Sequence, residues 1–304
     1  MTVAAGLAVA AIALVYARPG GGALPVSGDA RLPTAPASYL GLYAPGGPAS
    51  YAGVTAFARA ASVRPNVASY YSGWRERFWT SFAVTAREHG AVPLVQIDPT
   101  GISLAAIASG RYDRYLSSYA AAVRAYGQPV ILSFGHEMNG YWYSWGYRHT
   151  RAAVFVAAWR HIVRVFRAAG TRNVTWLWTV NAVQPPPHEV PDPAAWWPGR
   201  SYVTWVGIDG YYLSRSATFS ALFGPTITAV RELTTDPILI SESAAVPAAG
   251  QPAKIADLFA GVRAYGLLGV VWFDALTNAD YRIRTPAAYA AFRRAAGTFR
   301  LLEL

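Results

Sequence analysis

Short apolar runs alternate with longer amphipathic stretches from Ser38 to the end of the chain. The apolar runs predict eight strands, at residues 39–43, 66–71, 93–97, 129–134, 174–180, 203–211, 237–241 and 268–273. The amphipathic stretches predict helices, at residues 74–88, 111–125, 152–169, 221–233, 253–265 and 287–296. In the third of these, Val154, Ala158, His161, Val165 and Ala168 recur at the three- and four-residue spacing of one helix face. Strands that alternate with helices in this way are typical of a parallel sheet.

Glycines separate the predicted helices from the strands that follow them. Gly90, Gly127, Gly170 and Gly266 each come after a helical stretch and shortly before the next strand, as helix C-caps do. Eight strand–helix units favour a closed barrel over an open doubly wound sheet, and no glycine-rich nucleotide-binding motif follows any strand. We therefore expect an α/β fold in which residues 37–304 form a single (β/α)8 TIM barrel.

The N-terminal residues differ in composition from the rest of the chain. Residues 2–17 are almost wholly apolar and carry no charged side chain, and residues 18–36 are rich in glycine, proline and alanine. The apolar stretch is shorter than the ~20 residues that span a bilayer comfortably. We predict a signal peptide or membrane anchor at residues 1–17 and a linker at residues 18–36. A buried helix is the third interpretation. Export predicts a secreted or cell-envelope-associated protein.

The composition narrows the classes of partner. The formal net charge is +10, but the arginines are scattered, Lys254 is the single lysine, and no dense basic run indicates a nucleic-acid partner. The chain has no cysteine, which excludes disulfides and thiolate metal sites. Since no metal-ligand cluster or cofactor motif is present, we expect no cofactor. We also expect a monomer.

Two glutamates stand out at the positions where barrel enzymes place their chemistry. Glu137 and Glu242 follow the fourth and seventh predicted strands, and the carboxyl ends of these strands lie on opposite sides of a barrel mouth. Two carboxyl groups that flank a glycosidic bond can serve as proton donor and as nucleophile or base. Asp98, Asp209 and Asp274 are competing carboxylates near strand ends. His136-Glu137 begins like a zinc-protease motif, but Gly140 replaces the second histidine, which argues against such a zinc site.

Aromatic side chains surround these carboxylates in the sequence. Sugar rings stack on tryptophan and tyrosine, and their hydroxyls need polar partners. The predicted substrate-binding residues are His136, Trp142, Tyr211, Trp272, Tyr71, Trp74, Trp145 and Asn181. For Trp272, packing in the core is the alternative.

Residues 135–146, Gly-His-Glu-Met-Asn-Gly-Tyr-Trp-Tyr-Ser-Trp-Gly, closely resemble the acid/base motif of glycoside hydrolase family 26. The resemblance extends to residues 178–181, 206–211, 240–242 and 271–274. It implies a retaining barrel enzyme with Glu137 as acid/base and Glu242 as nucleophile. It also implies sugar contacts by His136, Trp142, Tyr211 and Trp272, and a hydroxyl bond from Tyr211 to Glu242. Ser133, Thr179-Val180 and Ser243-Ala244-Ala245 depart from the family's usual residues without removing a catalytic carboxyl.

Together, the residues and the resemblance predict a retaining glycoside hydrolase. The family contains β-mannanases and enzymes that act on other β-glycans, so the expected substrate is β-1,4-mannan or a related β-linked polysaccharide. Two other classes remain open on the same fold. One is a glycan-binding protein without catalysis, and the other is a membrane-associated protein of polysaccharide assembly.

Overall fold

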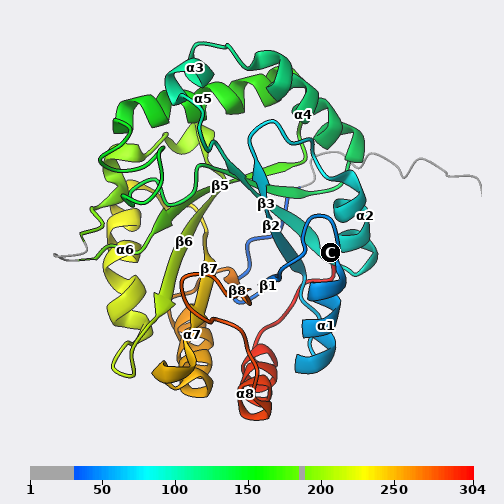
Figure 1. The fold of residues 1–304 in the computed structure, drawn as a ribbon, viewed down its shortest axis with the longest axis vertical. Coiled ribbons are helices and arrows are strands. Elements are labelled where there is room, and N and C mark those ends of the chain that lie inside the picture. Colours follow the sequence, from blue (N-terminus) through cyan, green and yellow to red (C-terminus); the bar gives the residue numbers. More distant parts are fainter. Residues whose placement is uncertain (1–30, 185–188) are drawn as a thin grey trace, which may run out of the picture.

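The computed structural model describes residues 31–184 and 189–304. Eight parallel strands close into a barrel in their sequence order, each paired with its neighbours and β8 paired with β1. The strands are β1 (Tyr39–Tyr43), β2 (Val67–Gly73), β3 (Val92–Asp98), β4 (Val130–Phe134), β5 (Val174–Asn181), β6 (Trp205–Tyr212), β7 (Ile238–Ala245) and β8 (Gly269–Phe273). The prediction of a single (β/α)8 TIM barrel is confirmed (Figure 1).

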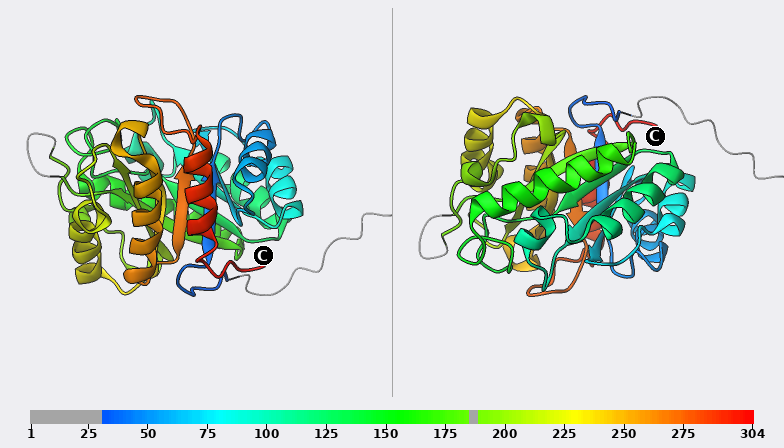
Figure 2. Two further views of the ribbon diagram at one scale, coloured as in Figure 1. Left: turned by 90° about the horizontal axis from the view of Figure 1, so that it is seen from below. Right: turned by 90° about the horizontal axis from the view of Figure 1, so that it is seen from above.

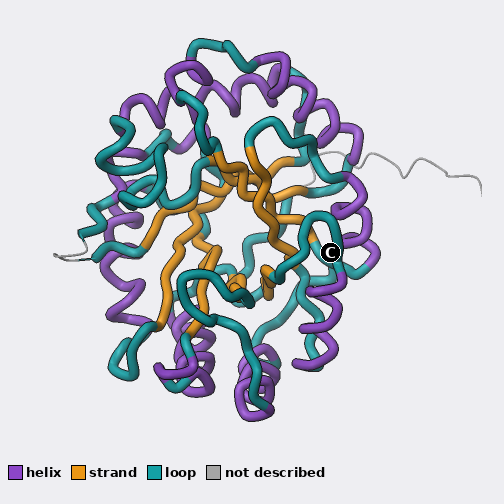
Figure 3. The backbone as a smooth tube through the Cα atoms, in the orientation of Figure 1, coloured by secondary structure: helices purple, strands orange, loops and turns teal. Residues whose placement is uncertain are grey.

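Helices cover the outside of the barrel, and Figure 3 shows them as a ring around the strands. They are α1 (Ala52–Ala61), α2 (Thr80–Glu88), α3 (Leu104–Ala108), α4 (Asp113–Tyr126), α5 (Ala152–Ala168), α6 (Phe219–Leu233), α7 (Gln251–Ala264) and α8 (Pro286–Ala296). Helix α7 lies beside α8 (Figure 2). The sequence did not predict α1 or α3. Helix α1 has no side-chain cap at Tyr51, so the usual signal for a helix start is missing there.

The strands are buried on both faces, which explains their nearly continuous apolar sequences. Side chains that point into the barrel form a lower core, which includes Tyr39, Leu94, Leu177, Trp205 and Val271. Side chains that point outward pack against the helices in a larger core. Polar side chains lie above the lower core toward the carboxyl ends of the strands, where Ser133 and Thr179 share a hydrogen bond of 3.0 Å. The inward-facing layer above the lower core is therefore polar at Ser133 and Thr179.

Two predicted helices differ from the structure. The stretch 74–88 becomes helical only at Thr80, because Arg75 has a left-handed φ of 75° that interrupts a helix. On α5 the buried face consists of Phe155, Trp159, Phe166 and their neighbours, while Val154, His161, Val165 and Ala168 lie outside it. The predicted face is right for Ala158, which is buried, and Val154 and Val165 pack at the edge of the core. The centre of the buried face is set by the large aromatic rings, where Trp159 lies 6.3 Å from Trp176 between ring centroids.

The start of the described chain packs on the closed end of the barrel. Leu32 is buried in the lower core, and the Tyr39 hydroxyl donates to the carbonyl of Pro33 at 2.6 Å. Leu32 and Pro33 therefore contact the barrel, whereas Thr34, Ala35 and Pro36 are exposed, and the linker at residues 18–36 stays a prediction. The predicted leader at residues 1–17 and the linker residues 18–30 lie outside the described residues. In residues 31–184 and 189–304, no helix has the length and apolar character needed to cross a membrane.

Candidate active site

Glu137 lies just beyond β4 in an unusual backbone conformation. Its φ is 53°, in the left-handed region that residues other than glycine rarely adopt, and Gly135 before it has a φ of 54°. The Glu137 amide donates to the carbonyl of Thr179 on β5 at 2.9 Å, which fixes the turn to the neighbouring strand. Strained residues of this kind gather at functional sites, because surrounding structure must hold them in place. Here the turn directs a buried carboxyl toward the end of β5.

The Glu137 carboxylate accepts one hydrogen bond on each oxygen. Asn181 donates from Nδ2 to Oε1 at 2.5 Å, and Trp142 donates from Nε1 to Oε2 at 2.8 Å. Asn181 is itself held by the buried Asn139, which bonds both its amide and its carbonyl at 2.8 and 2.9 Å. Trp142 is 41% exposed, so it offers a fixed aromatic face to solvent beside the carboxylate. The sequence predicted Asn181 and Trp142 here but missed Asn139.

A β-bulge directs Glu242 into the barrel. Leu239 faces the lower core and Ile240 faces the helices, as the alternation of a strand requires. Ser241 then faces inward, where its hydroxyl donates to Asp209 Oδ1 at 2.6 Å. The pairing of β6 and β7 shifts at this point, so that Asp209 is opposite Glu242. The extra residue in β7 lets Glu242 follow Ser241 on the inner side, as bulges re-aim side chains near active sites.

Glu242 is buried, and this changes its proton affinity. Burial raises the pKa of its carboxyl from 4.5 to about 8. The Tyr71 hydroxyl on β2 donates to Glu242 Oε2. The expected bond from Tyr211 is absent from the hydrogen bonds of the described residues; its ring instead packs against Tyr281, with 4.5 Å between centroids. Tyr71 is therefore the tyrosine that donates a hydrogen bond to Glu242, in place of Tyr211.

His136 connects the site to two further strand ends. Its Nδ1 lies 2.8 Å from Asp98 Oδ1 at the end of β3, and its Nε2 lies 3.1 Å from the Tyr143 hydroxyl. Burial alone would lower the pKa of His136, but the charge and hydrogen bond of Asp98 outweigh it and raise the pKa to about 9. The ring is therefore a cation at neutral pH. Trp145 is only 2% exposed and donates to the His136 carbonyl at 2.9 Å, so it supports His136, and the predicted sugar contact is wrong for it.

Asp209 is a third buried carboxyl in the site. Burial raises its pKa well above the usual value, and the nearby charge of Glu137 adds to this effect. Its Oδ1 accepts from Ser241, whereas its Oδ2 has no hydrogen-bond partner among the described residues. Through its bond to Ser241, the residue before Glu242, Asp209 can position the part of β7 that carries Glu242.

Two predicted tryptophans make no hydrogen bond to either glutamate in the described part of the chain. Trp272 has no exposed surface and its ring lies 5.7 Å from Phe292 of α8, so the predicted sugar contact is wrong. The alternation of β8 turns Trp272 outward to the helices and Phe273 toward the mouth. Trp74 packs against Tyr115 of α4 at 5.0 Å and is not brought together with the two glutamates.

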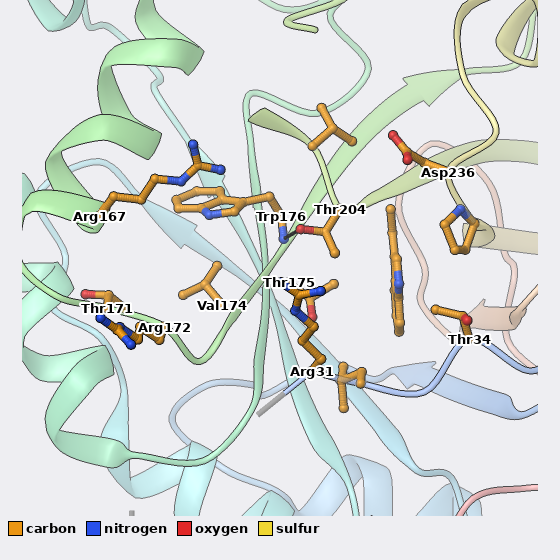
Figure 4. Close-up of a pocket in the computed structure, with 14 residues that line it drawn as sticks. Arg31, Thr34, Arg167, Thr171, Arg172, Val174, Thr175, Trp176, Thr204 and Asp236 are labelled. Carbon is orange, nitrogen blue, oxygen red and sulfur yellow. Dashed lines mark hydrogen bonds between the residues drawn. The ribbon is translucent and has the colours of Figure 1, made fainter. Parts of the chain in front are cut away.

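A pocket of about 600 Å³ lies at the opposite end of the barrel, near the amino ends of β5 and β6. Figure 4 shows Arg31, Arg167, Arg172 and Asp236 among its lining residues. It contains neither glutamate, so it is separate from the candidate site.

Among the residues that the structure describes, no group of three or more histidine, aspartate or glutamate side chains is arranged to hold a metal ion.

Comparison with known proteins identifies relatives of the chain. The profile of glycosyl hydrolase family 26 matches residues 104–246. Endoglucanase H of Acetivibrio thermocellus is 30% identical over 252 residues, which cover 76% of this chain and 27% of that protein. Mannan endo-1,4-beta-mannosidase A and B of Caldalkalibacillus mannanilyticus is 29% identical over 93 residues, which cover 28% of this chain and 17% of that protein. The chain thus spans only a small part of the length of both relatives.

The fold is also found in solved structures. An endo-beta-1,4-mannanase double mutant from Cellulomonas fimi superposes with a TM-score of 0.69 at 16% identity, covering 88% of this chain and 72% of that one. The profile match includes both Glu137 and Glu242, and the barrel holds Glu137 just after β4 and Glu242 within β7. With the profile match, the relatives and the fold in agreement, the chain belongs to glycosyl hydrolase family 26.

Proposed function

We propose that this protein hydrolyses a β-linked polysaccharide with retention of anomeric configuration, using Glu137 as acid/base and Glu242 as nucleophile. The observation that carries the proposal is the pair of buried glutamates just after β4 and within β7, each with its own donors. Glu137 is bonded by two neutral donors, and Glu242 by a single tyrosine. Different surroundings are what allow two carboxyls in one site to carry out different steps.

In the proposed first step, Glu137 gives its proton to the glycosidic oxygen and Glu242 bonds to the anomeric carbon. The bond between that carbon and the oxygen breaks, and the leaving sugar departs as an alcohol. In the second step Glu137 takes a proton from water, and the water oxygen bonds to the anomeric carbon. The ester bond to Glu242 breaks, so both carboxyls return to their starting states.

The proton of Glu242 must be absent when the attack begins. Since burial raises the pKa of Glu242 to about 8, most of this carboxyl is protonated at neutral pH without substrate. The productive form carries one proton on the pair, on Glu137. We therefore propose that the rate on natural glycan at low substrate is greatest in the pH range where the pair holds a single proton.

The proposed substrate is β-1,4-mannan or a related β-glycan. The names of the two relatives, an endoglucanase and a mannan endo-1,4-beta-mannosidase, support a β-linked backbone. The exposed ring of Trp142 beside Glu137 supports a glycan as well, since a sugar on the leaving side of the bond can stack there.

The test is product release from β-mannan, β-xylan and mixed-linkage β-glucan, followed by mass spectrometry. Wild type and Glu242→Gln are compared, with Glu88→Gln as a control that removes an exposed carboxyl at the end of α2. Oligosaccharides from wild type and the control alone support the proposal and name the substrate. Tight binding of a glycan without product would favour the non-catalytic or assembly alternatives. Proton NMR of the first product distinguishes retention from inversion.

We also propose export, through the apolar residues 1–17, to the compartment where such polysaccharides occur. Expression of the full chain in a bacterial host, fractionation and N-terminal sequencing test this. A shortened N-terminus in the medium supports a cleaved leader, and an intact N-terminus in the membrane fraction supports an anchor. Intact protein in the soluble cell fraction would contradict both.

A further inference from the structure

An aromatic wall lies beside Glu242, which accepts a hydrogen bond from one of its members, Tyr71. We use this name for Tyr71, Tyr43, Phe273, Tyr281 and Tyr211. The Tyr43 ring stacks on Phe273, with 4.7 Å between centroids and 9° between planes, and meets the edge of Tyr71 at 5.1 Å. Phe273 continues the wall to Tyr281 at 5.9 Å. The sequence predicted only Tyr71 and Tyr211 among these residues.

Tyr43 has a distinct position within the wall. It is the last residue of β1, so it lies at the carboxyl end of the barrel. Phe273 and Tyr71 hold its ring from two sides, and its carbonyl accepts from the Asp274 amide at 2.9 Å. It is only partly buried. The hydrogen bonds of the described residues include none from the Tyr43 hydroxyl, and its ring is fixed by Phe273 and Tyr71, so a positioned donor and acceptor is available to a ligand.

The segment 274–285 supports this arrangement from the far side. The Asp274 carboxylate accepts from the Ile283 amide at 2.8 Å, and the Tyr281 amide donates to the Ala275 carbonyl at 3.0 Å. The buried Gln251 joins this segment to β7, because its Nε2 donates to both Ala245 and Arg282. The strand that carries Glu242 and the segment that carries Tyr281 are thus tied together by one side chain.

The proposed reaction determines how the substrate is oriented in the site. The leaving oxygen must face Glu137, and the anomeric carbon must face Glu242. The leaving sugar therefore lies toward Trp142, and the sugar that is attacked lies over Glu242, beside the aromatic wall. Burial raises the pKa of Tyr43 and the charge of Glu242 raises it further, which agrees with a hydroxyl close to that carboxyl.

We propose that the Tyr43 hydroxyl binds a hydroxyl of the sugar that Glu242 attacks, which makes Tyr43 a specificity-determining residue of the glycone side. The inference rests on the proposed function. Phe273 and Tyr71 fix the ring, so the hydroxyl accepts only a sugar that presents its partner at one position. The hydrogen bond is made to the glycone, so its contribution to kcat/KM should be the same for different leaving groups.

The test combines Tyr43→Phe with aryl β-glycosides of mannose and glucose series that each lack one hydroxyl on the glycone. Tyr43→Phe removes the hydroxyl and keeps the stacked ring. We expect kcat/KM to fall about 10-fold on the complete glycone, as for loss of one neutral hydrogen bond. With wild type, the kcat/KM of one deoxy substrate should be about 10-fold below that of the complete glycone. On this substrate, Tyr43→Phe should have the same kcat/KM as wild type. Tyr265→Phe, at the end of α7, is the matched control.

The outcomes separate the two levels of inference. Wild type that cleaves no glycoside or glycan overturns the proposed function and this inference with it. Active wild type with an unchanged Tyr43→Phe variant overturns the inference alone. The inference is also overturned if the fold-loss in kcat/KM caused by Tyr43→Phe is the same on every deoxy substrate as on the complete glycone. That pattern would mean that the Tyr43 hydroxyl acts through Glu242 and not through a hydroxyl of the sugar. Equal melting temperatures of both tyrosine variants and wild type show that folding is not the cause.

Discussion

Replacing Glu242 by glutamine tests how much the burial of an ionised carboxyl at this position lowers the free energy of unfolding. Because the folded pKa is raised, the folded state binds the proton more tightly than the unfolded chain does. The resulting stability is fully present below the unfolded pKa of 4.5, is lost as pH rises toward about 8, and stays lost above that. Glutamine is neutral throughout and lacks this dependence.

The magnitude follows from the two pKa values. The interval from 4.5 to about 8, at about 1.36 kcal/mol per pH unit, gives a loss of roughly 5 kcal/mol for a carboxyl that is 8% exposed. About 3 kcal/mol of this loss is reached at pH 7. Glu242→Gln should therefore be close to wild type in stability near pH 4.5 and clearly more stable than wild type at pH 8.

Urea unfolding at a series of pH values measures this difference. The free energy of unfolding of wild type minus that of Glu242→Gln should decrease steadily between pH 5 and pH 8 and then level off. Glu88→Gln reports the effect of the same chemical change at an exposed site. A wild-type minus Glu242→Gln difference that stays constant within about 1 kcal/mol from pH 5 to pH 9 would refute the reasoning. It would mean that folding leaves the proton affinity of Glu242 unchanged.

Three further predictions concern activity and packing. On an activated aryl glycoside, whose leaving group needs no proton from Glu137, the kcat/KM of wild type should rise with pH along a limb centred near 8; a limb near 4.5 would contradict the raised pKa of Glu242. Glu137→Ala should lose far more rate on natural glycan, whose leaving group needs a proton, than on an activated aryl glycoside, and equal losses would argue against an acid role. Trp272→Ala should lower the free energy of unfolding by about 3–5 kcal/mol, since the ring is fully buried against Phe292; a small loss with a raised KM would restore the sugar contact.

The sequence was sufficient to predict the barrel, because eight apolar runs separated by helical stretches are typical of few other folds. The predicted end of the seventh strand at Ser241 was wrong, because β7 continues to Ala245 and contains Glu242. His136, Trp142, Asn181 and Tyr71 were found because each lies in or beside a strand-end motif. In the structure all four take part in the hydrogen bonds of the two glutamates or of Asp98.

The features that the sequence did not predict depend on one-residue differences in register and on loop structure. Trp272 and Phe273 are neighbours, and only the alternation of β8 decides which one faces the mouth. The bulge that places both Ser241 and Glu242 inside the barrel has no sequence signal of its own. Tyr281 reaches the site from the segment after β8, and its position depends on contacts such as that of Gln251, which are distant in sequence.

The left-handed backbone at Glu137 has a consequence for how this protein would change under selection. A side chain in that region costs about 1–2 kcal/mol relative to glycine, and the buried carboxyl of Glu242 opposes folding at neutral pH as well. Heat resistance selected without an activity screen should therefore favour Glu137→Gly and neutral residues at Glu242. The two positions most valuable to a hydrolase are the ones where thermostability is gained most easily by giving up turnover.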